Sequence, residues 1–221
     1  MSGRAAVDVL LPVRDAAATL AETLDSLEAQ TRPDFRCLIL DDGSTDAGPA
    51  IAAERAARDP RFELHRLPRR GIVDALNDGV ARLRAPYAAR IDADDRMRPE
   101  RLRRQLEFLD AHADLDVVAS RVEFFGDPLS AEMAAYRDWM NSLVTHEQIV
   151  GDLFVEAPLA HPSVTMRSES LTKLGGYRPL PFPEDYDLWL RAWRAGWRFA
   201  KLPEALTELR DHPGRLTRTD R

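Results

Sequence analysis

Short apolar runs alternate with segments of helical period along the first half of the chain, and this alternation constrains the fold more than any other feature. Leu20, Leu24 and Leu27 show the helical period, because they fall on one face of a helix expected within residues 16–30. A repeated strand–helix order predicts an α/β fold with a mainly parallel central sheet flanked by helices on both faces. The strands are expected at 7–12, 35–40, 62–67, 87–91 and 117–125, and the other helices at 46–58, 71–83 and 99–111.

The second half of the chain, beyond residue 125, follows a different pattern. A polar, partly helical connector comes first, at 127–151. An amphipathic helix at 184–195 then places Trp189 and Trp193 on one apolar stripe, for which core packing is favoured over stacking on a sugar. Because no repeat or low-complexity linker divides the chain, we predict a single domain over residues 1–221. The remaining elements are expected to be strands at 161–166, 199–202 and 205–209 and a short helix at 168–174.

Composition argues against several classes of protein. Hydrophobic residues make up 44 % of the 221 residues, enough to bury a sizeable core, so a disordered chain is not expected. The 37 acidic and 31 basic residues give a net charge of −6, which argues against a nucleic-acid partner. The one cysteine, Cys37, cannot form an internal disulfide and is expected to be an inert buried thiol. No apolar run approaches the roughly 18 residues of a membrane span, so we expect a cytoplasmic protein, with docking at the inner face of a membrane left open.

Two acidic clusters directly follow predicted strands, at the edge where parallel sheets bind ligands. Asp92, Asp94 and Asp95 follow the fourth strand. Carboxylates there suit Mg²⁺ or Mn²⁺, which complete their shells with phosphate oxygens and water, although an isolated D-x-D is more often a solvated turn. Asp41 and Asp42 follow the second strand. An aspartate there can accept hydrogen bonds from a nucleobase or ribose, or can simply close a tight turn and cap a helix.

A third acidic pair opens the amphipathic helix of the second half. Glu184 and Asp185 fall in its first turn, where negative charge stabilises the helix dipole. A carboxylate at this position can equally serve as the general base that removes a proton from an attacking hydroxyl. Spacing alone does not choose between the two roles.

These clusters and the segments around them resemble the family 2 glycosyltransferases, which have the GT-A fold. The shared motifs occur in the same order from about residue 7 to residue 214, and the joint pattern is highly specific. They are Val9-Leu10-Leu11-Pro12-Val13-Arg14, Leu40-Asp41-Asp42-Gly43-Ser44-Thr45-Asp46, Arg70-Gly71, Ala75-Leu76-Asn77-Asp78-Gly79, Ile91-Asp92-Ala93-Asp94-Asp95, Pro99-Glu100-Arg101-Leu102, His161-Pro162-Ser163, Gly175-Gly176-Tyr177, Glu184-Asp185, Leu202-Pro203-Glu204 and Arg210-Asp211-His212.

The resemblance implies a nucleotide-sugar donor, with a UDP-sugar favoured. Pro12 and Val13 would border the base, and Asp41 and Asp42 would contact uracil or ribose. Arg70 is also assigned to the donor, although an arginine in such a loop is more often solvated. The resemblance also places Asn77, Asp92 and Asp94 at the donor.

The resemblance also implies a divalent cation, Mn²⁺ or Mg²⁺, that bridges the diphosphate. Asp94 would ligate it, Asp92 would lie near the ribose and a metal-bound water, and Asp95 would give support. His212 resembles a C-terminal histidine that helps to hold the metal or the diphosphate in some relatives, but an unstructured tail is an equal alternative. Because acidic loops would repel a diphosphate without a cation, we expect metal dependence.

On the acceptor side, the resemblance makes Asp185 the base that deprotonates the acceptor hydroxyl, with Glu184 beside it. One base opposite the departing diphosphate suffices for direct displacement, so inversion at the anomeric carbon is expected. Residues of about 7–125 would bind the donor, and residues of about 126–221 a saccharide or glycoconjugate acceptor. For His161, packing is slightly favoured over an acceptor contact.

Other functions stay open on the sequence. A nucleotidyltransferase would normally carry a glycine-rich basic loop after the first strand, where this chain has only Arg14. A phosphatase of the D-x-D type would place its acidic pair after the first strand rather than the fourth. A non-catalytic nucleotide-sugar-binding protein would explain the donor motifs but would leave Glu184 and Asp185 without a role.

Overall fold

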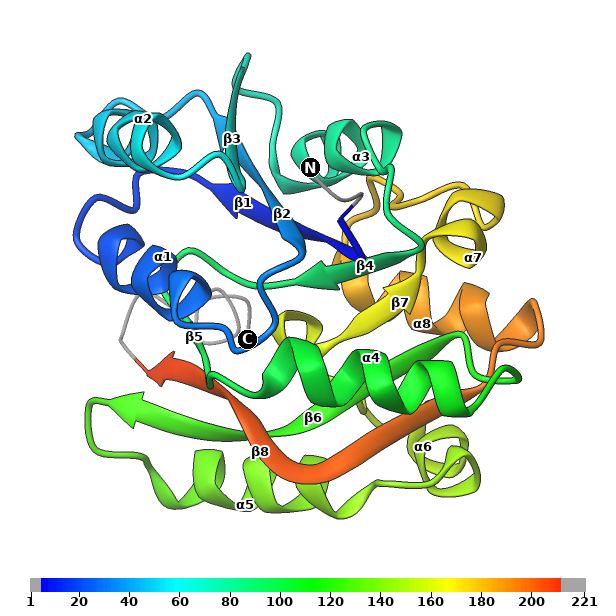
Figure 1. The fold of residues 1–221 in the computed structure, drawn as a ribbon. Helices are drawn as coiled ribbons and strands as arrows, with labels where there is room; N and C mark the ends of the chain where they lie inside the picture. The colour runs from blue at the N-terminus through cyan, green and yellow to red at the C-terminus, as the bar shows by residue number, and fades with distance from the viewer. Residues whose placement is uncertain (1–4, 212–221) are drawn as a thin grey trace.

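The computed structural model describes residues 5–211 and shows one sheet with helices packed on both faces (Figure 1). Its strands are β1 (Val7–Val13), β2 (Phe35–Asp42), β3 (Phe62–Leu67), β4 (Tyr87–Arg90), β5 (Arg96–Met97), β6 (Val117–Gly126), β7 (Thr165–Arg167) and β8 (Phe199–Asp211). Its helices are α1 (Leu20–Glu28), α2 (Gly48–Arg58), α3 (Ile72–Ala81), α4 (Arg101–Ala111), α5 (Ala131–Ser142), α6 (His146–Asp152), α7 (Ser168–Lys173) and α8 (Glu184–Arg194), with a 3-10 turn, η1, at His161–Ser163.

The sheet has the strand order β3-β2-β1-β4-β7-β6-β8-β5. The first four strands in this order are parallel, with Val13 of β1 beside Asp41 of β2 and Leu10 of β1 beside Arg90 of β4. Strands β6 and β8 are also parallel, whereas β7 and β5 run antiparallel to their neighbours. The predicted α/β fold with a mainly parallel sheet is therefore confirmed. Its physical basis is the strand–helix alternation, because each crossover helix returns the chain to the same edge of the sheet.

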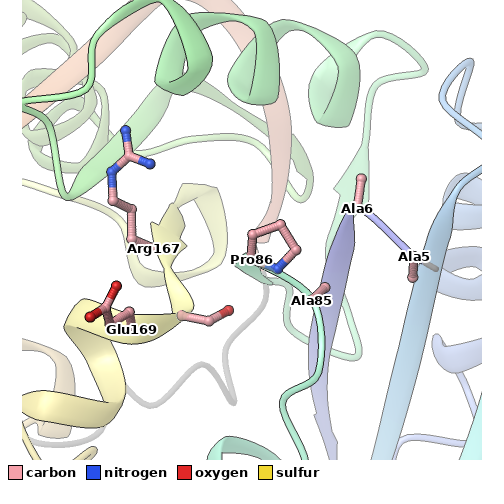
Figure 2. A pocket seen from close by; sticks show the side chains of 7 residues that line it. Ala5, Ala6, Ala85, Pro86, Arg167 and Glu169 are labelled. Carbon is pink, nitrogen blue, oxygen red and sulfur yellow. The ribbon is translucent and has the colours of Figure 1, made fainter.

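A cavity of about 580 Å³ lies at the amino ends of β1 and β4 (Figure 2). Ala6 and Pro86 border it just before these strands begin, and Arg167 borders it where β7 meets α7. The Arg167 guanidinium is committed to the protein itself, because it donates hydrogen bonds to the backbone carbonyls of Leu115 and Leu109. Because the cavity lies at the amino ends of the strands, it is at the edge opposite to the one where parallel sheets usually bind ligands.

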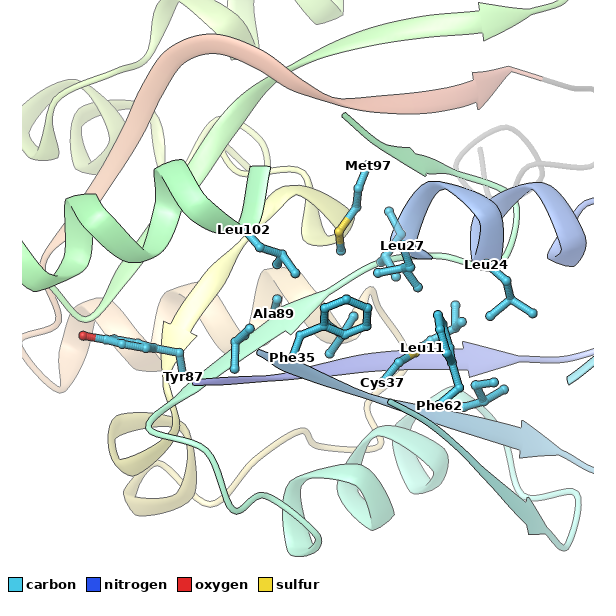
Figure 3. Packing of buried hydrophobic residues seen from close by; sticks show 14 of the residues in the cluster. Leu11, Leu24, Leu27, Phe35, Cys37, Phe62, Tyr87, Ala89, Met97 and Leu102 are labelled. Carbon is cyan, nitrogen blue, oxygen red and sulfur yellow. The ribbon is translucent and has the colours of Figure 1, made fainter. Parts of the chain in front are cut away.

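The apolar residues of the central strands alternate between two cores, one on each face of the sheet. Val9 and Leu11 of β1 belong to the core beneath α1, α2 and α4, whereas Leu10 belongs to the core beneath α3, α6, α7 and α8. Figure 3 shows the first core, where Leu24 and Leu27 of α1 lie over the side chains of β1, β2 and β4. Because a strand covered on both faces buries successive side chains, these runs are almost continuously apolar.

Strand β8 corrects the prediction of two separate strands at 199–202 and 205–209. It is one strand, paired in parallel with β6, and its register shifts on either side of Arg121. Ser120 lies beside Leu202 and Arg121 beside Ala205, so Pro203 falls in a bulge. A proline has no amide hydrogen to contribute to the ladder, and a bulge lets the strand continue past it.

Two further predictions for the second half are wrong. The strand expected at 161–166 covers only residues 165–167, because His161 begins the 3-10 turn η1. Trp189 is buried as expected, but Trp193 is 40 % exposed and packs edge to face against the exposed ring of Phe154, with 5.3 Å between the ring centroids. The buried stripe of α8 is therefore narrower than predicted. Among residues 5–211, none of the helices is both long and apolar enough to cross a membrane.

Lys201 of β8 is a buried lysine that anchors two neighbouring segments. It is 2 % exposed, and its Nζ donates hydrogen bonds to the backbone carbonyls of Met140 and Pro158. Burial, with a smaller contribution from the positive charge of Arg121, lowers the pKa of Lys201 from 10.5 to about 7.

This shift predicts a specific pH dependence of stability. Between pH 7 and pH 8.5 the unfolded chain keeps the Lys201 proton and the folded chain releases it, so the free energy of unfolding should increase with pH. The increase should be about 1 to 2 kcal/mol across this window. Lys201→Met should remove it in urea unfolding experiments, whereas Lys173→Met, which changes an exposed lysine, should keep it. Equal slopes in the two variants would contradict the assignment.

Candidate active site

Three parallel strands end at one edge of the sheet, and each carries a predicted donor motif there. Strand β1 ends with Pro12 and Val13, which are buried, and β2 ends with Asp41 and Asp42. The acidic segment 92–95 follows the end of β4. Because β1 lies between β2 and β4 in the sheet, the structure brings these motifs together at the carboxyl edge.

Hydrogen bonds between side chains and backbone groups join the loops that follow these strands. The amide of Asp15, in the loop after β1, donates to Ser44 Oγ in the loop after β2, at 3.0 Å. Thr19, just before α1, donates from Oγ1 to the carbonyl of Ala93 in the loop after β4, at 2.9 Å. The loop after β1 is thus bonded to both others. Loops held in this way keep their carboxylates in fixed positions.

Asp41 has one carboxylate oxygen that lacks a hydrogen-bond donor. The residue is 1 % exposed, and Oδ1 accepts a hydrogen bond from the amide of Ser44 at 3.0 Å, which closes the turn. No residue in the described part of the chain donates a hydrogen bond to Oδ2, and the exposed Arg66 has its Nε 3.5 Å away. A buried acceptor without a donor is unfavourable, so Oδ2 is suited to an N–H or O–H group of a bound molecule.

Asp42 is bonded to the backbone instead. Its carboxylate accepts hydrogen bonds from the amides of Arg70, at 2.7 Å, and Gly71, at 3.0 Å. The turn at Gly43 packs against the same loop, since a Cβ at this position would lie 2.9 Å from the Cβ of Arg69. Asp42 therefore ties the loop after β3 to the end of β2. The predicted contacts of Asp42 and of the exposed Arg70 with a donor remain predictions.

Asp92, Asp94 and Asp95 each offer a carboxylate oxygen, and these oxygens lie within 4.8 Å of one another. The segment is fixed from two sides. Asp95 Oδ1 accepts a hydrogen bond from the amide of Arg210 at 2.8 Å, and its carbonyl accepts one from Thr23 Oγ1 at 2.8 Å. A group of hard oxygen ligands this compact fits Mg²⁺ or Mn²⁺.

Glu184 and Asp185 begin α8, and both are half-buried beside His161. His161 is 5 % exposed, with Nδ1 3.5 Å from Glu184 Oε1 and Nε2 in a 2.9 Å hydrogen bond with the Tyr177 hydroxyl. Asp185 Oδ1 accepts a hydrogen bond from the amide of Tyr186 at 2.8 Å. His161 is thus packed, and it also contacts Glu184, which the sequence did not predict.

Burial and neighbouring charges set the protonation of this pair differently. For Glu184, burial opposes ionisation, but the hydrogen bond and charge of His161 outweigh it and lower the pKa to about 2. For Asp185, burial has the largest effect, and repulsion from Glu184 adds to it, so the pKa is raised despite the attraction of His161. A raised pKa increases the affinity of a carboxylate for a proton, which suits a general base.

Two other predicted site residues have different outcomes. The side-chain amide of Asn77 donates to the carbonyl of Tyr177 at 3.0 Å and accepts from its backbone amide at 2.9 Å. Asn77 therefore joins α3 to the turn at Tyr177, and its contact with a donor remains a prediction. His212 lies outside the described residues.

The structure adds Arg90 and Tyr177 to the predicted set. Arg90 ends β4 at 1 % exposure, with Nη1 2.6 Å from Asp92 Oδ1. An arginine inside an otherwise apolar run is the sequence signal that could have identified it, because arginine is seldom buried without a partner. Tyr177 lies in the quoted Gly-Gly-Tyr motif, but nothing in the sequence indicates its hydrogen bond to His161.

The sequence profile described as glycosyl transferase family 2 matches residues 8–175. The chain belongs to this family. One relative is EpsE of Bacillus subtilis (strain 168), which is named as a glycosyltransferase. The two sequences are 30 % identical over 210 residues, and the alignment covers 93 % of this chain and 73 % of EpsE. A second relative is AmsE of Erwinia amylovora, which is named as an amylovoran biosynthesis glycosyltransferase. It is 27 % identical to this chain over 192 residues, and the alignment covers 86 % of this chain and 70 % of AmsE.

Solved structures confirm the GT-A fold of this family 2 glycosyltransferase. The S. aureus TarS 1-349 structure in complex with UDP-GlcNAc superposes with a TM-score of 0.75 at 19 % identity, over 97 % of this chain and 61 % of that one. Mannosyltransferase PcManGT from Pyrobaculum calidifontis, in complex with GDP-Man and Mn²⁺, gives a TM-score of 0.72 at 20 % identity, over 93 % and 57 %. This chain thus spans about three fifths of each solved chain.

The close packing at Gly43 generates a stability prediction. Gly43→Ala should lower the free energy of unfolding by about 1–3 kcal/mol, because φ is +66° and the added Cβ would lie 2.9 Å from that of Arg69. Gly151→Ala is the matched control, because Gly151 of α6 has open space around it, and alanine there should stabilise by about 0.4–1 kcal/mol. Urea unfolding measures both. A Gly43→Ala variant as stable as the wild type would show that the loops are not packed this closely.

Proposed function

We propose that this glycosyltransferase is metal-dependent and inverting, and that it moves a sugar from a nucleotide diphosphate donor, with a UDP-sugar favoured, to a hydroxyl of a saccharide or glycoconjugate. The observation that carries the proposal is the pairing of two features at one edge. The buried Asp41 Oδ2 lacks a donor among the described residues, and the Asp92, Asp94 and Asp95 carboxylates form a compact cluster there. A nucleoside diphosphate complements both, because its base and ribose offer N–H and O–H groups and its phosphates bind cations.

The donor-side residues have separate tasks in this proposal. Asp94 would hold Mn²⁺ or Mg²⁺, with Asp92 and Asp95 beside it and His212 assigned from the resemblance alone. Such a cation, when bound, supplies a Lewis acid that stabilises the negative charge of the departing diphosphate. Asp41 would accept a hydrogen bond from the base or ribose and so orient the donor.

The acceptor-side task falls to Asp185. It would take the proton of the attacking hydroxyl while the acceptor oxygen bonds to the anomeric carbon and the bond from that carbon to the diphosphate breaks. The raised pKa of Asp185 suits proton uptake, and the low pKa of Glu184 keeps a negative charge beside His161. Attack from the side opposite the diphosphate inverts the anomeric configuration.

The relatives support the setting of this reaction. AmsE is named for amylovoran biosynthesis, so we place this chain in the synthesis of a polysaccharide or glycoconjugate. TarS binds UDP-GlcNAc and PcManGT binds GDP-Man, so a donor screen should include both. We assign donor binding to about residues 7–125 and acceptor binding to about residues 126–221. A cytoplasmic location, with docking at the inner face of a membrane, remains a prediction of the sequence.

Donor binding can be tested by titration calorimetry with UDP. Affinity should be high with Mn²⁺ and fall strongly with EDTA, and Asp94→Asn should remove most of the gain from Mn²⁺ because it removes a charged ligand. Asp41→Ala should weaken UDP binding even at saturating Mn²⁺. Asp78→Asn, which changes a carboxylate paired with Arg82 on α3, should behave as wild type. Equal UDP affinity with and without EDTA would contradict the metal role.

The base can be tested on α8 itself. Asp185→Asn should keep UDP and Mn²⁺ affinity near wild type and slow sugar transfer about 10²–10⁴-fold, the usual contribution of a general base. Asp187→Asn changes another acidic residue in the same first turn and breaks its 2.6 Å ion pair with Arg191, so it should lose stability but retain turnover. Normal sugar transfer by Asp185→Asn would mean that Asp185 is not the base and that Glu184 and Asp185 only stabilise the dipole of α8. A wild type that binds UDP but transfers no sugar from any donor would favour a non-catalytic nucleotide-sugar-binding protein.

A further inference from the structure

Arg90 is a buried arginine to which the proposed function gives no task. Its backbone is fixed from both sides, because its amide donates to the carbonyl of Val164 at 3.0 Å and its carbonyl accepts from Arg101 Nη2 at 2.9 Å. The guanidinium is 1 % exposed, with Nη1 2.6 Å from Asp92 Oδ1. Within the described part of the chain, no group accepts a hydrogen bond from Nε or Nη1, so Nη1 and Asp92 interact as an ion pair without an aligned hydrogen bond. Burying a charged group with so few partners is costly, so its place in the site calls for a physical reason.

The charge of Arg90 acts on both carboxylate motifs. On the donor side it forms the ion pair with Asp92. On the acceptor side it favours the ionised forms of both acids, so it adds slightly to the lowering of the pKa of Glu184 and slightly reduces the rise that burial causes in the pKa of Asp185. Burial alone would lower the pKa of Arg90 itself, and attraction to the carboxylates of Asp92 and Glu184 reverses that effect. One fixed cation therefore compensates negative charge on both sides.

We propose that Arg90 is a positioning residue that links the donor and acceptor sides of the site. Its ion pair orients Asp92, and its buried positive charge favours the ionised forms of Glu184 and Asp185. The inference rests on the proposed function, and it goes beyond that function by giving a task to a residue outside the acidic motifs.

Arg101 provides a matched comparison, because it is a second buried arginine in contact with Arg90. Its guanidinium donates to the carbonyls of Pro162 and Val164, to that of Arg90 and to Gln105 Oε1. All of these acceptors are neutral. Arg101 therefore fastens backbone segments together, whereas the ion pair of Arg90 is with a carboxylate of the site.

The experiment compares Arg90→Met, Arg90→Lys and Arg101→Met with the wild type in three measurements. Thermal unfolding gives the folded fraction. Calorimetry with UDP and Mn²⁺ gives donor-side binding. Hydrolysis of UDP-GlcNAc and of GDP-Man with Mn²⁺, followed against pH, gives kcat and KM for whichever donor the wild type uses. The acidic limb of the kcat profile reports the base Asp185, which is faced by Glu184, His161, Tyr177 and Arg90.

Arg90→Met should lower kcat per folded molecule about 10²-fold, the scale of a misplaced reacting group. Its KM for the donor should rise and its affinity for UDP with Mn²⁺ should fall, because Asp92 loses the ion pair that orients it. The acidic limb should move to higher pH because Asp185 loses an attractive charge. Arg90→Lys should keep the limb near wild type and recover part of kcat, since it retains the charge without the planar fork. Arg101→Met should unfold at a lower temperature without moving the limb.

Two results would overturn the role of Arg90. One is a folded Arg90→Met variant with wild-type kcat and pH profile. The other is an equal shift of the limb in Arg101→Met, which would mean that any buried arginine there acts only through stability. If Arg90→Met does not fold, a wild-type kcat in Arg90→Lys still counts against the ion-pair geometry. A wild type that binds no UDP and hydrolyses neither donor contradicts the proposed function itself, and this outcome is separate from any difference between the variants.

Discussion

The parallel pairing of β1 with β2 on one side and β4 on the other is the interaction on which the site depends. It fixes the ends of three strands at one edge, with Val13 beside Asp41 and Leu10 beside Arg90. A shift of one residue in either register would exchange the two faces of a strand that is buried on both. Because successive side chains of these strands must fill two cores, groups that bind a polar ligand are placed where the strands end.

Two carboxylates that are equally buried in this protein, Asp8 and Asp41, differ in their hydrogen bonding. Asp8 of β1 is fully buried, and its two oxygens accept hydrogen bonds from Arg36 and from the amides of Arg84 and Ala85. Its acceptors are used within the protein, so it has no capacity for a ligand. Asp41 is equally buried at the other end of the neighbouring strand, yet one oxygen lacks a donor among the described residues. The unsatisfied atom, rather than the burial, identifies the residue suited to a ligand.

The local hydrophobic period and the position of the acidic motifs after strands made the fold and the edge of the site predictable from the sequence. The long-range contacts between side chains could not be predicted in this way. Asp41 and the 92–95 segment could be placed together because each follows a strand of a parallel sheet, and that rule needs no side-chain contact. The bonds of Asp42 to the loop after β3, and the contact of His161 with Glu184, join segments whose approach no local pattern encodes. Trp193 was misplaced for a related reason, because helical period gives the direction of a side chain but not how far the neighbouring segments extend over it.

The two sides of the site are held by different kinds of interaction. The loops assigned to the donor are fixed by hydrogen bonds that involve the backbone, some neutral, such as that from Thr19 to the carbonyl of Ala93, and some to carboxylates, such as those of Asp42 and Asp95. The side assigned to the acceptor depends on charges held in a buried environment, where His161 and Arg90 favour the ionised form of Glu184, and Glu184 opposes the ionisation of Asp185. In such surroundings a change of one charge acts more strongly than it would in water. It follows that substitutions of Thr19 or Ser44 should act mainly through geometry, whereas substitutions that change the charge at Glu184, Asp185 or Arg90 should act through protonation as well.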